Sequence, residues 1–398
     1  MGYHHCWFPA KSEKMKLLLI PDKFKGSLTS EEVSKAFISG VEKAGLKFTS
    51  RYIKASDGGD GFMDAVANYR ACISVQVISE NPLGKPIQSY YLYNKKNNSA
   101  YIELANASGM ELLNADERDP MLTSTYGTGL QIIDAIKKGV KHIYIGLGGS
   151  ATNDGGIGIA KAMGYSFLDA QGKKLLPVGS SLVKIKSIDD SKVSENLSQV
   201  SFYAVNDVTN PLFGKTGAAF VYAAQKGATE SVIQELDKGL ENLNKVVVEK
   251  YSTNNALLPG SGAAGGAAYG LKTFLGAKYI SGIDFILELS EVEKLLGSEK
   301  FDFIVTGEGK IDEQTLNGKL IQGVVRLGEK YSIKVIAICG KLEVSKIELT
   351  KKGIFDVFEI RDPDKTLEYN MRNAEQLLSK KATEYFLSSQ ENPLLGKH

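Results

Sequence analysis

The feature that most constrains the fold is an alternation of short apolar runs with helical segments, which opens the chain and returns near its end. Between the first two runs, Thr29 followed by Glu32 forms a capping-box pattern before a helical repeat of apolar residues. An order of strand, helix, strand, helix predicts a parallel sheet covered by helices. The runs expected as strands are Leu17–Ile20, Phe48–Ala55, Phe301–Val305, Val335–Cys339 and Asp356–Ile360.

The middle of the chain has a different pattern. Its first strand-like runs follow one another without helices between them, which indicates an antiparallel segment. We therefore predict an α/β protein: a Rossmann-like parallel-sheet domain built from both chain ends, with a second, mixed α/β domain inserted. The expected ranges are 15–69 with 290–398 for the discontinuous domain, 70–289 for the insertion and 1–14 for a disordered extension.

Composition excludes several classes of partner. Lys and Arg number 48 against 46 Asp and Glu, a net charge of +2, which gives no reason to expect nucleic acid or a membrane surface. The 3 cysteines are far apart and the chain has 4 His, so we expect no zinc site. Sparse cysteines and the absence of a targeting pattern favour the cytoplasm.

Acidic residues, lysines and glycines follow several of the predicted strands. Ligands of open parallel sheets bind beyond the carboxyl ends of the strands. Phosphoryl transfer needs such groups: carboxylates for Mg²⁺, lysines for phosphate oxygens, and glycines that admit the backbone closely. Asp-Gly and Gly-Asp are also ordinary turn pairs, so one such turn alone could be structural. The turns are Asp22-Lys23, Asp57–Gly61, Thr306–Gly309 and Gly340-Lys341.

The densest motif, Gly146–Gly156, lies between a predicted strand and a helix in the inserted domain. Its N–H groups and hydroxyls could cradle an anion at the helix N-terminus. Part of the motif, Gly146-x-Gly148-x-x-Ala151, also matches a dinucleotide fingerprint, with Asp169 about twenty residues further on. An NAD(P)-dependent oxidoreductase therefore stays open as an alternative, although a lone match of this kind is a weak indication.

Three other segments bear on function. Phe213–Thr216 resembles the end of a phosphate-binding P-loop, but Thr209 stands where its first glycine is required, so we reject that interpretation. Asn206-Asp207 ends a predicted strand at Ser201–Val205, where Asp207 could act as a base or metal ligand, or only begin a turn. The glycine-rich segment Pro259–Gly270 is expected to be a flexible loop or hinge.

Taken together, these motifs resemble the type-1 glycerate kinases, in family order and over roughly residues 15–360. The most specific match is Gly148–Gly156. The chain departs from the family's usual residues at Ser56, Asp60 and Phe62, where Ala, Glu and Thr are usual. The remaining matches are Leu17–Leu28, Asp57–Gly61, Thr125–Gly129, Asp207–Leu212, Gln225–Thr229, Gly262–Gly266 and Thr306–Thr315.

The resemblance implies a two-domain kinase with the active site in the interdomain cleft. It implies transfer of the ATP γ-phosphate to D-glycerate with Mg²⁺, at the 2-hydroxyl, by a monomer or homodimer. A glycerate 3-kinase, a kinase for another small hydroxy acid and a non-catalytic binding protein are the alternatives. Within this family reading, we expect Asp57, Asp207, Lys23 and Lys25 to be catalytic and Asp57 and Glu308 to bind the metal. Expected to bind substrate or nucleotide are Asp22, Gly58, Gly59, Gly148, Gly149, Ser150, Thr152, Asn153, Asp154, Thr306, Gly307, Glu308 and Lys310.

Overall fold

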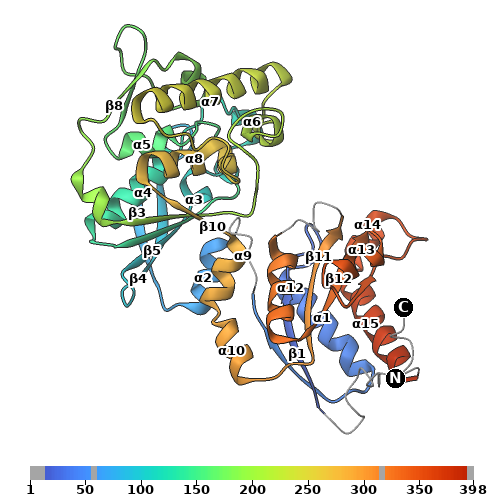
Figure 1. The fold of residues 1–398 in the computed structure, drawn as a ribbon. Coiled ribbons are helices and arrows are strands. Elements are labelled where there is room, and N and C mark those ends of the chain that lie inside the picture. Colours follow the sequence, from blue (N-terminus) through green and yellow to red (C-terminus); the bar gives the residue numbers. More distant parts are fainter. Residues whose placement is uncertain (1–13, 55–60, 313–318, 392–398) are drawn as a thin grey trace. The chain divides into compact units, whose positions relative to one another are not determined.

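The computed structural model describes residues 14–54, 61–312 and 319–391 of the chain, without the side chains of 196, 319 and 389–391 (Figure 1). The chain divides into two compact units. Unit 1 consists of Met1–Ala55 with Ile286–His398, and unit 2 of Ser56–Phe285. The sheet of unit 1 contains strands from both chain ends, which confirms the predicted α/β fold with an inserted mixed sheet.

Unit 1 has a five-stranded sheet in the order β13-β12-β11-β1-β2, and every neighbouring pair is parallel. Apart from the edge strand β2, the strands are rich in buried Ile, Leu, Val and Phe because both faces of the sheet are covered. The strands are β1 (Met15–Pro21), β2 (Phe48–Tyr52), β11 (Phe303–Ile311), β12 (Lys334–Leu342) and β13 (Asp356–Glu359).

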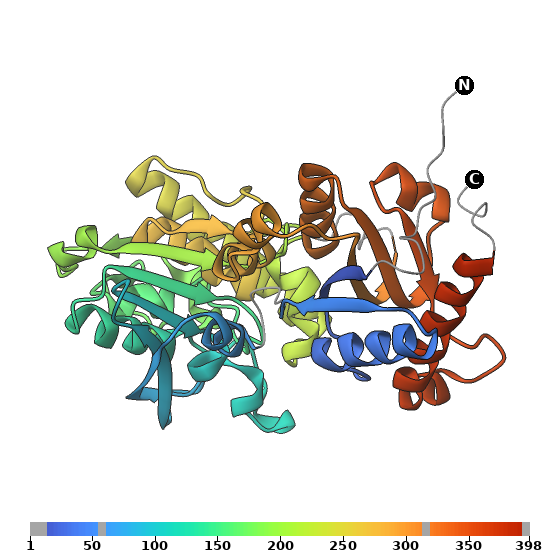
Figure 2. The same ribbon diagram turned by 90° about the horizontal axis from the view of Figure 1, so that it is seen from below.

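Helices α1 and α15 pack against one face of this sheet, and α12 lies on the other (Figure 2). Phe37 of α1 and Phe386 of α15 meet edge to face, with ring centroids 5.8 Å apart. The helices of unit 1 are α1 (Ser30–Lys43), α10 (Val292–Ser298), α12 (Lys319–Tyr331), α13 (Lys346–Lys351), α14 (Leu367–Arg372) and α15 (Ala374–Glu391).

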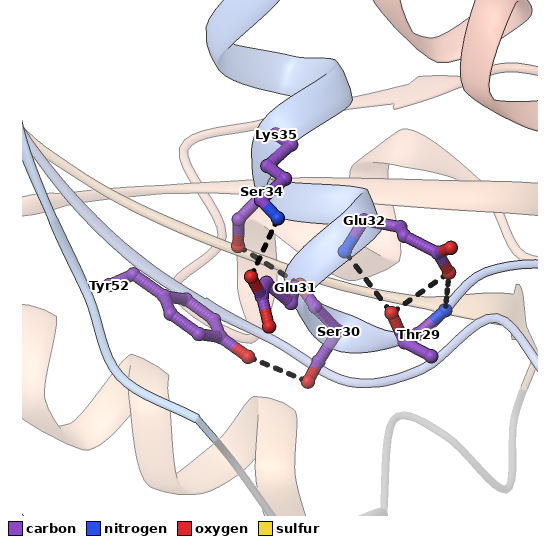
Figure 3. Close-up of polar contacts among 7 residues, drawn as sticks. All are labelled: Thr29, Ser30, Glu31, Glu32, Ser34, Lys35 and Tyr52. Atoms are coloured by element: carbon purple, nitrogen blue, oxygen red, sulfur yellow. Dashed lines mark hydrogen bonds and ion pairs between the residues drawn. The ribbon is translucent and has the colours of Figure 1, made fainter.

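The start of α1 carries the capping box that the sequence predicts (Figure 3). Glu32 N donates to Thr29 Oγ1 at 3.2 Å, and Thr29 N donates to Glu32 Oε2 at 2.8 Å. Beside the box, the hydroxyls of Ser30 and Tyr52 are 2.8 Å apart. Because Tyr52 ends β2, this contact fastens the carboxyl end of β2 to the first turn of α1.

Unit 2 is built on a six-stranded sheet in the order β10-β9-β6-β5-β4-β3. Strands β5, β6, β9 and β10 are parallel, whereas β3 and β4 are antiparallel, as the closely spaced runs predict. A separate two-stranded sheet pairs β7 with β8. The strands are β3 (Ile73–Glu80), β4 (Pro86–Asn94), β5 (Ser99–Glu103), β6 (His142–Gly146), β7 (Ser166–Leu168), β8 (Ser187–Asp189), β9 (Ser201–Val205) and β10 (Lys278–Ile280).

Helices α4, α5 and α8 fill one face of the large sheet with apolar side chains. On the other face, Tyr101, Tyr144 and Tyr203 stack across three strands, and Phe285 of α9 packs on Tyr101 and Tyr144. The helices are α2 (Phe62–Tyr69), α3 (Ala105–Ser108), α4 (Tyr126–Lys137), α5 (Ile157–Ala162), α6 (Ala218–Tyr222), α7 (Glu230–Tyr251), α8 (Ala263–Leu275) and α9 (Gly282–Leu289), which crosses from unit 2 into unit 1.

The domain boundaries expected from the sequence, at 69/70 and 289/290, remain a proposal for where one independently folding domain ends and the next begins. In the structure the units divide at 55/56 and 285/286. Helix α2 accordingly packs within unit 2, where the Phe62 ring stacks on Phe285 at 5.4 Å. Most of the extension expected over 1–14 lies outside the described residues.

The expectation of a flexible loop over Pro259–Gly270 is wrong. Residues from Ala263 onward form α8, which is almost entirely buried. Ala264, Gly265 and Gly266 adopt left-handed backbone angles and kink the start of the helix. The glycines permit close packing there, since a Cβ on Gly265 would lie 2.0 Å from Thr152 O.

None of the described helices is both long and apolar enough to cross a membrane.

Candidate active site

In unit 1 the predicted site residues gather where the strand order reverses. Strands β1 and β11 are neighbours in the sheet. From β1 the chain continues to β2, towards one edge of the sheet, and from β11 it continues to β12, towards the opposite edge. The carboxyl ends of β1 and β11 therefore flank a topological switch point, which is the ligand-binding position in open parallel sheets. Asp22 N donates to Gly307 O at 2.8 Å, so Asp22-Lys23 adjoins Thr306–Glu308.

Some residues at this edge of the sheet are buried and hold the strands together, and others are exposed to solvent. Thr306 is fully buried and its hydroxyl donates to Ile20 O at 3.0 Å, which ties β11 to β1. Gly307 must be glycine, because a Cβ there would lie 2.2 Å from Ile338 O on β12. Glu308 is half-buried, and Lys23 and Lys25 are exposed. The two lysines are therefore the exposed cations at this edge, and Asp22 and Glu308 are its half-buried carboxylates.

Strand β11 runs further than the sequence predicts. Thr306–Gly309 was expected to follow the strand, yet β11 continues to Ile311 and pairs with β12 along its length. Lys310 lies in this extension, where it forms ion pairs with Asp312 at 2.8 Å and Glu343 at 3.2 Å. Hydrogen bonds to these carboxylates raise the pKa of Lys310. A phosphate contact from Lys310 would have to compete with both carboxylates.

In unit 2 the carboxyl ends of the parallel strands present a second group of polar residues. Glu103, at the end of β5, accepts hydrogen bonds from Gly61 N at 3.3 Å and Met63 N at 3.2 Å, at the start of α2. Asp207, directly after β9 and the buried Asn206, accepts from Ser281 Oγ at 2.8 Å and Gly282 N at 3.1 Å. Both carboxylates are therefore oriented by fixed donors.

The Gly148–Gly156 loop connects β6 to α5 and is held by Asp154. The Asp154 carboxylate accepts four hydrogen bonds: from Thr125 N at 2.8 Å, Thr125 Oγ1 at 2.7 Å, Gly156 N at 3.0 Å and Gly158 N at 3.2 Å. Burial raises the pKa of Asp154, and these donors oppose the rise by stabilising the anion. Asp154 is fully buried and its oxygens are used inside the protein.

This bonding corrects one expectation about the motif. The N-terminus of α5 was expected to receive an anion, but the Asp154 carboxylate already takes up the Gly156 and Gly158 amides. Gly155 N is likewise bonded, to Gly265 O at 3.0 Å. The groups left for a ligand lie earlier in the loop, from Gly148 to Asn153.

Two side chains in that earlier part are buried without partners. Thr152 and Asn153 have no exposed surface, and Thr152 Oγ1, Asn153 Oδ1 and Asn153 Nδ2 make no hydrogen bond within the described part of the chain. An unsatisfied buried polar group costs about 1–3 kcal/mol. A ligand with hydroxyl and carboxylate groups would satisfy these atoms. Gly148 and Gly149, beside them, are partly exposed.

The resemblance placed Lys226 in the matching segment Gln225–Thr229 but gave it no role, whereas in the structure this lysine supports the Gly148–Gly156 loop. Its Nζ donates to Ser150 Oγ at 2.8 Å and to Thr152 O at 2.6 Å. Lysine is normally exposed, so no pattern marked it as buried. The following Gly227 becomes informative only in the structure, where its φ of +97° ends the short helix that carries Lys226.

The structure removes the basis for the dinucleotide alternative. In such a fold the strand after the glycine-rich turn and helix joins the same parallel sheet. Here that strand is β7, which pairs antiparallel with β8 in a separate sheet. Asp169 accepts hydrogen bonds from Gln171 N and Lys173 N, both at 2.9 Å, and so closes an exposed turn.

The residues expected to bind the metal fall partly outside the described residues. Asp57, Gly58 and Gly59 lie outside the described residues, and the described residues contain no group of three His, Cys, Asp or Glu side chains suited to a metal. Mg²⁺ bound with a nucleotide uses one or two protein carboxylates together with phosphate oxygens. Glu308 and Asp22, at the switch point of unit 1, have the chemistry that such an ion requires.

An α/β chain with acidic and basic groups at a switch point and a glycine-rich loop with unsatisfied polar groups has the features of a phosphotransferase. Residues 17–388 match the model of the glycerate kinase family. The chain belongs to the glycerate kinase family, and it is thus a phosphotransferase with glycerate kinase activity.

Individual relatives agree with this assignment. A glycerate kinase of Halalkalibacterium halodurans is 38% identical over 370 residues, which cover 92% of this chain and 96% of that protein. A glycerate 2-kinase of Escherichia coli is 35% identical over 360 residues, covering 90% and 94%. A solved protein of Salmonella typhimurium LT2, provisionally assigned as glycerate kinase 2, superposes with a TM-score of 0.75 at 35% identity and covers 96% of this chain and 99% of its own.

Proposed function

We propose that this enzyme transfers the γ-phosphate of Mg²⁺-bound ATP to the 2-hydroxyl of D-glycerate, giving 2-phosphoglycerate and ADP. The observation that carries the substrate part is the pair of buried, unpartnered side chains, Thr152 and Asn153, in the loop after β6. A hydroxy acid offers the acceptors and donors that these atoms lack. The 2-position is supported by the E. coli relative, which is a glycerate 2-kinase.

Phosphoryl transfer needs little covalent chemistry from the protein, so the residues act by positioning and charge neutralisation. When bound, Mg²⁺ would supply positive charge that offsets the charge developing on the phosphate. Asp57 and Glu308 are the proposed metal ligands. Lys23 and Lys25 would bind phosphate or the glycerate carboxylate. Asp207 would lie near the attacking hydroxyl, held in orientation by Ser281 and Gly282.

The other proposed binding residues have graded roles. Asp22, Thr306 and Gly307 would shape the backbone at the switch point, and Lys310 would be a secondary phosphate contact. Gly148, Gly149 and Ser150 would approach the ligand with Thr152 and Asn153, while Asp154 would fix the loop from inside. Gly58 and Gly59 would admit the phosphates closely.

The test is ADP release from Mg²⁺-ATP with D-glycerate in a coupled assay, followed by enolase acting on the product. ADP release with immediate enolase turnover supports a glycerate 2-kinase. Release without enolase turnover indicates 3-phosphoglycerate and overturns the 2-position. No release above a glycerate-free blank, from folded protein, overturns D-glycerate as substrate and leaves another small hydroxy acid.

The roles of the carboxylates have their own test. Asp57→Asn and Glu308→Gln should each abolish most turnover while the far-ultraviolet circular dichroism stays unchanged. Near-normal turnover in both variants would refute the metal-ligand assignment. Location in the cytoplasm and assembly as a monomer or homodimer remain predictions from the sequence.

A further inference from the structure

The feature that the proposed mechanism leaves unused is the buried amine of Lys226. This residue ends a short 3-10 helix, Ala224–Lys226, after α6, and its side chain is only 2% exposed. Burial lowers the pKa of Lys226 to about 7, while the charge of Asp154 acts in the opposite direction. Removing an ammonium group from water is costly unless its bonds compensate, so what the amine bonds to is informative.

Both partners of the amine belong to the Gly148–Gly156 loop. The Nζ atom donates to Ser150 Oγ at 2.8 Å and to Thr152 O at 2.6 Å. When the amine is charged it has three donors and no acceptor, so Ser150 Oγ accepts from it in that state. The Ser150 hydroxyl hydrogen is then directed away from Lys226. The bond to the Thr152 carbonyl is available to the amine in either protonation state, because a carbonyl oxygen only accepts.

The second bond also fixes a peptide plane. The peptide between Thr152 and Asn153 is trans, as are all the described peptide bonds, so its N–H points opposite to its carbonyl. Because Lys226 holds the Thr152 carbonyl, the Asn153 N–H faces away from the amine. Lys226 therefore lies on one side of the loop, and the donors of Ser150 and Asn153 are turned from it.

The turn that aims Lys226 is itself constrained. Gly227 has a φ of +97°, and a Cβ at this position would lie 2.1 Å from Arg118 O. Only glycine meets both conditions, so the backbone after Lys226 is locked against the segment at Arg118. The amine is thus held in place from both ends: by the turn behind it and by two hydrogen bonds in front.

We propose that Lys226 is a positioning residue for the substrate loop, which orients the Ser150 hydroxyl and the Asn153 N–H towards the bound ligand by holding Ser150 Oγ and Thr152 O from behind. This inference rests on the proposed function of the loop. It extends that function to a residue that does not itself touch the substrate.

The experiment compares Lys226→Met, which keeps the apolar stem and removes the donors, with Lys215→Met, an exposed lysine of the same unit. We measure kcat, KM for D-glycerate and KM for ATP separately, with the active fraction determined for each variant. Lys226→Met should lower kcat/KM for D-glycerate about 10- to 100-fold. The KM for D-glycerate should rise, and the KM for ATP should stay unchanged. A purely structural role would reduce the active fraction and leave both KM values unchanged, which would overturn the proposal.

Ser150→Ala provides the second variant, because it keeps Lys226 and the Thr152 bond and stays informative if Lys226→Met fails to fold. Ser150→Ala should raise the same KM value, by a smaller factor. In the double variant the two losses should add to less than their sum, since both substitutions remove the same Lys226–Ser150 hydrogen bond. Fully additive losses, or wild-type kinetics in Ser150→Ala, would overturn the assignment.

A separate measurement tests the role of Lys226 even if the wild-type enzyme has a different substrate. If the wild-type enzyme does not phosphorylate D-glycerate, the loop is examined by amide hydrogen exchange without ligand. Faster exchange over 148–153 in Lys226→Met than in Lys215→Met would still support positioning of the loop by Lys226. Equal exchange in the two variants would overturn it.

Discussion

The polar side chains of the Gly148–Gly156 loop fall into two groups at the scale of single residues. Asp154 is fully bonded within the protein, whereas Thr152 and Asn153 are buried without partners among the described residues. The proposed function uses this difference: Asp154 would hold the loop, and Thr152 and Asn153 would meet the ligand. The sequence placed all three residues at the site but could not separate their roles, because burial and bonding depend on contacts with Thr125 and Lys226.

Asp154→Asn should destabilise the fold by about 2–4 kcal/mol. The amide would place a donor against one of the backbone N–H groups that now bond to the carboxylate, and it would remove the negative charge near Lys226. Chemical denaturation monitored by circular dichroism measures the loss. Asp116→Asn, at an exposed position, is the control and should change stability by less than about 0.5 kcal/mol. Equal effects of the two substitutions would contradict the structural role of Asp154.

The buried amine predicts a pH dependence of stability. The pKa of Lys226 falls from 10.5 to about 7 in the folded protein. Between these two values the unfolded chain binds more protons than the folded one, so the free energy of unfolding should rise with pH. The Tm of the wild type minus the Tm of Lys226→Met should therefore increase as pH rises from 7 towards 10. The difference from Lys215→Met should stay constant, and a constant difference for Lys226→Met as well would rule out the buried charge change.

At the scale of elements, the sequence predicted most helices and strands, because apolar periodicity and capping residues are local signals. The strand at Ser201–Val205 matches its predicted bounds, and the capping box of Thr29 and Glu32 begins a helix as predicted. Two errors share one cause. Glycines in β11 and α8 suggested a turn and a loop, but they permit close approach of neighbouring backbones, which no local pattern reveals.

Gly307→Ala tests this explanation in β11. A Cβ at this position would meet Ile338 O at 2.2 Å, so β11 and β12 would have to separate beside Glu308. We expect a loss of stability of about 2 kcal/mol or more and a marked loss of activity. Gly297→Ala is the matched control, because nothing lies within 4 Å of its Cβ and alanine favours helix α10. Urea unfolding of both variants gives the comparison, and tolerance of Gly307→Ala would contradict the close strand packing.

At the scale of the whole molecule, we expect the proposed metal to act in the reaction and not to hold the fold together. The described residues form no cluster of three metal-binding side chains. Removal of divalent cations with EDTA should therefore abolish turnover and leave the Tm within about 1 °C, and added Mg²⁺ should restore activity. A large fall in Tm on chelation would show that a structural metal is present. Full activity in EDTA would exclude a role for Mg²⁺.

By itself, the sequence determined the α/β class, the discontinuous order of the chain and the family, because strand-helix alternation and motif order are written along the chain. Only the tertiary structure decided which polar groups form their hydrogen bonds within the protein. Asp154 accepts from the amide of Gly156 at the start of α5, Thr306 bonds β11 to β1, and Lys226 bonds to the Gly148–Gly156 loop. Each of these roles joins residues at least tens of positions apart or depends on complete burial, and both arise only when the sheets and helices pack.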